Sequence, residues 1–412
     1  MSGWEAKAIG EVCTIKPSKA EARAKLADSD EVSFAPMEDL GIGEKYLQPR
    51  RTRRLGEVSG SYTYFADGDV LLAKITPCFE NGKLGVARGL TNGIGFGSSE
   101  YIVLRPGAAL DAQFLYYYLS QPAFKEEGAR SMTGAVGHKR VTKEFVEGSS
   151  IPLPPLPEQR RLVAIIDEAF EAIAAAKANS EKNLQNAREV FEQSIAAMLR
   201  ERGDDWNAST IGEVCTLKSG TTVPIDVERP SGDIPYVKVA EMTMPENTDG
   251  ITTSIRFIDR SDLKPAWVIP AGAVIFPKRG GAILTNKKRL VLVDICADLN
   301  IMSVIPSDLI MPEFLYLFFL TVDMRKLGTG SSIPQINNYD IAPLSISFPS
   351  SKKLQQALTS RLALIKAECE SLASLHARKL DALDELKKSL LHRAFTGQLT
   401  AKATDQQLAV VA

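Results

Sequence analysis

Two long stretches of the chain carry apolar residues at helical spacing along a single face. One covers residues 154–203, with no proline or glycine between Pro157 and Gly203, and the other covers residues 349–400 and stops near Gly397. This spacing predicts two long amphipathic α-helices. The apolar positions are Leu162, Ile166, Ala169, Ile173 and Ala176 in the first stretch, and Leu358, Leu362, Ile365, Cys369 and Leu372 in the second. Because each stretch has one apolar stripe and is too long for a surface helix, we expect the two helices to pair as an antiparallel coiled coil.

The regions before the two helices have a different pattern. Residues 1–153 and 204–348 contain short apolar runs, such as Tyr101–Leu104 and Leu290–Val293, that are broken by glycine, proline and asparagine. Such runs are typical of β-strands joined by turns. We therefore expect an α+β protein with the order domain, helix, domain, helix, in which both domains are mixed α/β. A flexible tail is expected over residues 401–412.

The two halves of the chain repeat each other in sequence. Trp4 and the run Ile9–Cys13 (IGEVC) return as Trp206 and the identical run Ile211–Cys215. Further along, GDVLLAK, which ends at Lys74, is answered by GAVIFPK, which ends at Lys278. Self-similarity in the same order along two halves indicates a tandem duplication. The molecule is thus expected to have a pseudo-two-fold axis within one polypeptide.

Composition and charge exclude several classes of protein. The chain has 412 residues, 44% of them hydrophobic, a net charge of −1 and five cysteines. This composition is typical of folded domains, and the cysteine count fits a reducing compartment. No apolar run has the roughly 18–20 residues that a membrane helix needs, and the first residues do not resemble a signal peptide. We expect a cytoplasmic protein.

No pattern for catalysis was found. The sequence has no phosphate-binding loop, no Asn-Pro-Pro or Asp-Pro-Pro motif of amino-methyltransferases, and only three histidines, His138, His376 and His392. The cysteines lack the paired spacing of a zinc site. The sequence therefore predicts a binding protein without catalytic residues, metal or cofactor. The alternative is a nuclease site built from carboxylates and a lysine, whose pattern is too loose to be recognised in a sequence.

Basic and amide side chains are the candidates for contact with double-stranded DNA, because cations bind phosphates and planar amide or guanidinium groups bind base edges. The candidates are Arg51, Arg53, Arg54, Lys74, His138, Lys139 and Arg140 in the first domain, and Lys278, Arg279, Lys287, Lys288, Gln335, Asn337 and Asn338 in the second. Lys74 and Lys278 form the best pair, since the repeat places both at the same point. The alternatives are a solvated charged loop for the cations and a simple turn for the asparagines.

Two segments resemble a known family. Ile151–Arg160 (IPLPPLPEQR) and Leu391–Thr400 (LHRAFTGQLT) are similar to the conserved regions of specificity subunits of type I restriction–modification systems. The resemblance implies two target-recognition domains that each read one half of a bipartite DNA site. It also implies that the helices bind two modification (methyltransferase) subunits, and that a motor–nuclease restriction subunit joins the full complex. The second lead-in, Ile346–Lys353 (ISFPSSKK), departs from the first.

The predicted architecture also suggests how such a site would be spaced. A helix of about 45 residues spans roughly 65 Å at 1.5 Å per residue, or about two turns of DNA. Because the two domains differ in their loops, the expected target is asymmetric. The alternative hypothesis is a coiled-coil adaptor whose domains bind two copies of a protein partner instead of DNA.

Overall fold

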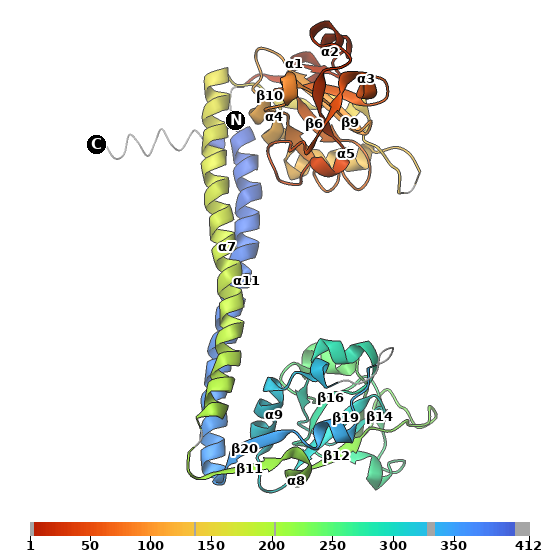
Figure 1. Cartoon of the computed structure of the whole chain (residues 1–412), viewed down its shortest axis with the longest axis vertical. Coiled ribbons are helices and arrows are strands. Elements are labelled where there is room, and N and C mark those ends of the chain that lie inside the picture. Colours follow the sequence, from red (N-terminus) through yellow and green to blue (C-terminus); the bar gives the residue numbers. More distant parts are fainter. Residues whose placement is uncertain (1–3, 136, 202, 328–333, 400–412) are drawn as a thin grey trace, which may run out of the picture. The chain divides into compact units, whose positions relative to one another are not determined.

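The computed structural model describes residues 4–135, 137–201, 203–327 and 334–399 (Figure 1). The predicted tail at 401–412 lies outside these residues. The structure divides into two compact units. The first contains the residues up to 180 together with those from 378 onward, and the second contains residues 181–377. Each unit holds one sheet-based domain and one part of each long helix, which confirms the predicted α+β fold.

The first unit contains two four-stranded sheets and a two-stranded ribbon. One sheet has the order β2 (Cys13–Ile15), β9 (Tyr101–Pro106), β6 (Val70–Ala73), β7 (Leu84–Val86). The other has the order β4 (Arg51–Arg54), β3 (Glu31–Ala35), β8 (Ile94–Gly97), β5 (Thr63–Ala66). The ribbon pairs β1 (Ala6–Ala8) with β10 (Ser150–Pro152). The helices of this domain are α1 (Ile9–Val12), α2 (Ala20–Lys25), α3 (Leu55–Val58), α4 (Ala112–Leu119), α5 (Pro122–Ser131) and α6 (Lys143–Gly148).

The second unit repeats this topology strand for strand. Its sheets have the orders β12 (Cys215–Ser219), β19 (Ile301–Pro306), β16 (Val274–Pro277), β17 (Arg289–Leu290), and β14 (Phe257–Ile258), β13 (Ile234–Val237), β18 (Ile295–Ala297), β15 (Val268–Ile269). The ribbon pairs β11 (Trp206–Thr210) with β20 (Ser345–Pro349). Its helices are α8 (Ile211–Val214), α9 (Pro312–Thr321) and α10 (Asn338–Ile341). In both units one pair is parallel, β3 with β8 and β13 with β18, and all other pairs are antiparallel.

The apolar run at Leu290–Val293 is a strand only at its beginning. Strand β17 ends at Leu290, and Val291 forms an isolated parallel bridge to Ile251. Leu292 and Val293 are 46% and 37% exposed. The apolar run is therefore longer than the strand, because the chain bends away from β16 after two residues and turns the last two side chains toward solvent.

The two long helices are α7 (Leu156–Arg200) and α11 (Lys352–Phe395). In the first unit they run antiparallel, since Lys177 contacts Asp384 at 2.8 Å while Lys387 lies 4.6 Å from the ring centre of Phe170. In the second unit Ile195 of α7 shares a buried cluster with Leu362 of α11. The helices are a few residues shorter than predicted. Gly397, in the left-handed region at φ +73°, follows the end of α11, as glycine commonly does at helix C-termini.

The apolar stripe on the helices is only partly covered. Leu162, Ile166, Ile173 and Leu362 are nearly fully buried, whereas Leu372 is 49% exposed. The physical reason is that a pair of helices buries only the narrow seam between them.

A buried glutamine joins each long helix to its domain. Gln159, the fourth residue of α7, accepts a hydrogen bond from the backbone N–H of Asp111 (2.8 Å) and donates to the carbonyls of Ala109 and Pro154 (both 2.8 Å). Gln355, the fourth residue of α11, repeats these three bonds with Met311, Leu309 and Pro349 at 2.8, 2.9 and 2.8 Å. Both glutamines are 0% exposed. The second lead-in thus keeps the residue that fastens the helix, although its prolines differ.

Candidate nucleic-acid interface

The residue that follows strand β6 in the first unit makes the same backbone hydrogen bonds as the residue that follows β16 in the second unit. The N–H of Lys74 donates to the carbonyl of Glu100 (2.9 Å), and its carbonyl accepts from the N–H of Val141 (2.9 Å). In the second unit Lys278 makes the same two bonds, to Asn300 and from Ile336, both at 2.8 Å. Three chain segments therefore meet at each junction, and the repeat places a lysine at the same point in both.

The side chains around these two lysines differ sharply. In the first unit the guanidinium of Arg140 makes two bonds to the carboxylate of Glu100, at 2.9 and 2.8 Å, and Lys74 Nζ lies 3.9 Å from the same carboxylate. These bonds from Arg140, together with the charge of Lys74, hold the pKa of Glu100 below its usual range. The junction in the first unit is therefore a network of charges.

In the second unit the equivalent positions carry amides. Asn300 stands where the first unit has Glu100, and Gln335, just before Ile336, stands where it has Arg140. Gln335 Oε1 accepts from Arg279 Nη2 (3.3 Å), and Gln335 Nε2 donates to Asn337 Oδ1 (2.6 Å). Lys278 Nζ donates to Ser219 Oγ (2.7 Å), and burial with the nearby Arg279 lowers the pKa of Lys278. Amides donate and accept hydrogen bonds, whereas the Arg140–Glu100 pair presents fixed charges.

A groove of about 580 Å³, the first-domain groove, opens beside Lys74 and Arg140. Its lining also includes the basic residues Lys16, Lys19 and Lys143 and the aromatic residues Tyr62, Tyr64 and Tyr101. Lys16 has φ +59°, in the left-handed region, and Lys19 Nζ donates to the carbonyls of Ser59 (3.2 Å) and Gly60 (2.8 Å). Basic groups beside aromatic rings are suited to binding a phosphate backbone and its bases.

The other candidates of the first domain lie on a sheet edge and a loop. Arg51, Arg53 and Arg54 belong to β4, an edge strand, and all three are exposed. Arg51 lies 3.3 Å from Glu38, and the Arg53 guanidinium lies 4.9 Å from the ring centre of Phe34. The exposed His138 and Lys139 directly precede Arg140, and the Lys139 carbonyl accepts from the Thr76 N–H (2.9 Å). The structure thus brings residues 138–140 next to Lys74.

Two lysines of the second domain differ in exposure. Lys287 is half-buried, and burial, with a smaller effect of Arg289, lowers its pKa. Lys288 is only 4% exposed, its ammonium donates to Asn286 Oδ1 (2.8 Å), and burial lowers its pKa to about 8. Lys288 therefore cannot reach a phosphate in this conformation.

The two asparagines lie at a helix start. Asn338 is the first residue of α10 and is exposed. The backbone N–H of Asn337 donates to Asp340 Oδ2 (2.7 Å), and its side-chain amide donates to the Tyr339 hydroxyl (2.8 Å). Asn337 therefore caps the start of α10, a structural role different from the simple turn expected as the alternative.

Sequence reasoning missed Glu100 and Asn300, because their equivalence lies in backbone hydrogen bonds that join distant segments. It also missed the paired glutamines Gln159 and Gln355, although each occupies the fourth position of its helix. Among the described residues, no group of three or more histidine, cysteine, aspartate or glutamate side chains could hold a metal ion. None of the described helices is long and apolar enough to cross a bilayer.

Several known proteins are similar to this chain. Residues 1–185 and 203–373 match the family model described as the type I restriction modification DNA specificity domain. The chain is 35% identical over 212 residues to the specificity subunit of the type I restriction enzyme EcoEI of Escherichia coli; the match covers 51% of this chain and 34% of that protein. It is 22% identical to the specificity subunit of the type I restriction enzyme MjaVIII of Methanocaldococcus jannaschii, over 97% of this chain and 93% of that one.

The fold is also that of a solved structure. The crystal structure of the HsdS subunit from Thermoanaerobacter tengcongensis superposes with a TM-score of 0.67, at 18% identity, and covers 96% of this chain and 97% of that one. At this level of identity the likeness establishes the fold.

Proposed function

This chain belongs to the type I restriction modification DNA specificity family, and on that premise we propose that it is the DNA specificity subunit of a type I restriction–modification complex. Each sheet-based domain contacts one half of a bipartite, asymmetric site in double-stranded DNA. The chain has no catalysis of its own and directs the modification and restriction subunits to their target. A cytoplasmic location follows from this role.

The observation that supports the proposal is the repeated lysine junction with unlike neighbours. Lys74 and Lys278 occupy the same backbone setting in the two units, as expected for a contact that both domains make with the phosphate backbone. The flanking pair is Glu100 with Arg140 in one unit and Asn300 with Gln335 in the other. Base edges are distinguished by their pattern of donors and acceptors, so different groups at these positions favour different bases.

The remaining residues of the proposed interface are those that lie exposed or half-exposed near these junctions or on the sheet edge. They are Arg51, Arg53, Arg54, His138, Lys139, Arg279, Lys287, Asn337 and Asn338. The long helices bind two modification subunits, and their lengths of 45 and 44 residues set the spacing between the two half-sites. The motor–nuclease restriction subunit joins this assembly.

The test is to co-express the chain with a modification subunit and to map methylation across the host DNA. We expect methylation at one bipartite motif with a fixed gap, and its loss when this chain is absent. The double substitution Glu100→Asn with Arg140→Gln gives the first junction the side chains of the second, and is expected to change the bases required in one half-site only.

The matched control is Glu127→Gln, which removes an exposed charge from α5 of the same domain and leaves both junctions and both long helices intact. It should leave the methylated motif unchanged. A palindromic motif, or a change in both half-sites, would contradict the assignment of one domain to each half. Absence of any chain-dependent methylation would favour the alternative adaptor that binds two copies of a protein partner.

A further inference from the structure

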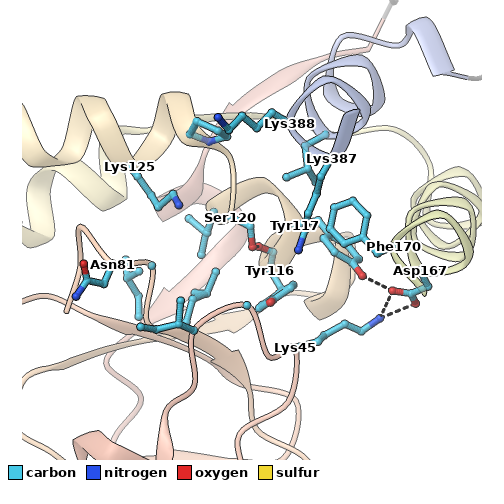
Figure 2. Close-up of a pocket in the computed structure, with 18 of the residues that line it drawn as sticks. Lys45, Asn81, Tyr116, Tyr117, Ser120, Lys125, Asp167, Phe170, Lys387 and Lys388 are labelled. Atoms are coloured by element: carbon cyan, nitrogen blue, oxygen red, sulfur yellow. Dashed lines mark hydrogen bonds and ion pairs between the residues drawn. The ribbon is translucent and has the colours of Figure 1, made fainter. Parts of the chain in front are cut away.

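A second cavity of the first unit lies between the domain and the long helices, away from the lysine junction (Figure 2). Its volume is about 700 Å³, within the range of small-molecule sites. The domain contributes Tyr116, Tyr117 and Ser120 from α4 and its end, and Lys125 from α5. Helices α7 and α11 contribute the opposite wall, with Asp167, Phe170, Lys387 and Lys388. We call it the helix-side cavity.

Most carboxylates of this cavity are already paired. Both oxygens of Asp167 accept from Lys45 Nζ at 2.6 Å, and the Tyr117 hydroxyl donates to the same carboxylate. Asp384 accepts from Lys177 Nζ at 2.8 Å. The third carboxylate of the lining, Glu171, is exposed. Two of the three lining carboxylates are therefore neutralised by lysines, and among the described residues only Glu171 has no cation at ion-pair distance.

Two ammonium groups of the cavity lack such a partner. Within the described residues, neither Lys125 nor Lys387 has a carboxylate at ion-pair distance, whereas their neighbour Lys388 is paired with Glu385 at 2.7 Å. Figure 2 shows Lys125 and Lys387 extending toward the same space from opposite walls. Burial lowers the pKa of Lys387, the charges of Lys177 and Lys125 lower it further, and the carboxylate of Asp384 offsets part of this by raising it. Holding two like charges around one half-enclosed space costs free energy unless an anion enters it.

The surroundings of the two lysines leave room for a ligand with an apolar part. The Lys387 ammonium lies 4.6 Å from the ring centre of Phe170, which packs edge-on against Tyr117 with ring centres 5.6 Å apart. Lys125 extends over Gly82, where an added Cβ would lie 3.3 Å from Lys125 Nζ and crowd it. The cavity thus combines two unpaired cations with an aromatic wall, and the exposed amide of Asn81 lies at its edge.

We propose that the helix-side cavity binds a small organic phosphate of the mononucleotide class. The phosphate group lies between Lys125 and Lys387, and the base lies against Phe170, the half-exposed ring of the aromatic wall, since Tyr117 is buried. Phosphate oxygens accept from both ammonium groups, because a dianion is the partner that two unpaired cations require. This site is separate from the DNA interface and does not depend on the function proposed above.

The experiment is isothermal titration calorimetry of the full chain with adenosine monophosphate, with inorganic phosphate and with adenosine. We expect adenosine monophosphate to bind most tightly, phosphate more weakly, and adenosine at least about tenfold more weakly than the nucleotide, since a charge-assisted bond is typically worth a factor of ten or more. Lys387→Gln and Lys125→Gln should each weaken nucleotide binding by about tenfold or more. Lys379→Gln removes an exposed lysine of the same helix outside the cavity and should leave binding unchanged.

A second measurement on the unaltered chain keeps the test independent of folding defects in the variants. The rate of chemical acetylation of each lysine is monitored by mass spectrometry. Adenosine monophosphate should slow acetylation of Lys125 and Lys387 and leave that of Lys379 unchanged. The proposal is overturned if millimolar nucleotide gives no heat and no protection, if adenosine binds as well as its phosphate, or if Lys379 is protected to the same extent. Tighter binding of phosphate than of the nucleotide would overturn the role of the aromatic wall.

Discussion

Replacing Gln355 by leucine tests whether the buried glutamine fastens α11 to the second domain. The side chain is fully buried and makes three hydrogen bonds, to Met311, Leu309 and Pro349. Leucine has a similar volume but makes none of them. At about 1 kcal/mol net for each bond, the loss is about 3 kcal/mol, and buried backbone groups left without a partner increase it.

The assay is urea unfolding followed by tryptophan fluorescence, since Trp206 and Trp267 both lie in the second unit. For a unit of about 200 residues, with a slope of about 2–3 kcal/mol per molar urea, a loss of 3 kcal/mol lowers the midpoint by about 1–1.5 M. The matched control is Gln356→Leu, which changes the neighbouring exposed glutamine. If the Gln355→Leu midpoint lies within about 0.3 M of that control, the three bonds do not stabilise the junction as argued.

Two further predictions concern buried titratable groups. Burial lowers the pKa of Lys288 to about 8 from a usual 10.5. Between these two pH values the unfolded chain holds the Lys288 proton more tightly than the folded chain, so the free energy of unfolding should rise as the pH increases from 8 to 10.5. Lys288→Met should be more stable at pH 7 and lose part of that rise; an equal pH dependence in urea titrations of both proteins would refute this. Burial also raises the pKa values of Cys13 and Cys296 to about 12. In the folded chain both thiols should react with iodoacetamide at pH 8 far more slowly than the half-buried Cys78, and in urea all should react at similar rates.

The sequence alone predicted the duplication, both long helices and the α+β order of elements. These features depend on local periodicity and on a run of identical residues, and both can be recognised in the sequence without knowing any tertiary contact. The apolar spacing that predicts α11 also marks Leu372, which the structure leaves half exposed. Periodicity identifies a face of a helix, but which part of that face is covered depends on the neighbouring elements.

Only the tertiary structure determines which side chains lie close together and which are buried. Lys74 and Lys278 could be paired from the repeat, but Glu100 and Asn300 become equivalent only through backbone bonds between segments far apart in the chain. Lys288 looked like its basic neighbours in the sequence and proved to be buried, because local composition does not report burial. The helix-side cavity likewise cannot be recognised in the sequence, since Lys125 and Lys387 lie far apart in the chain and line one cavity only because α11 packs beside the first domain.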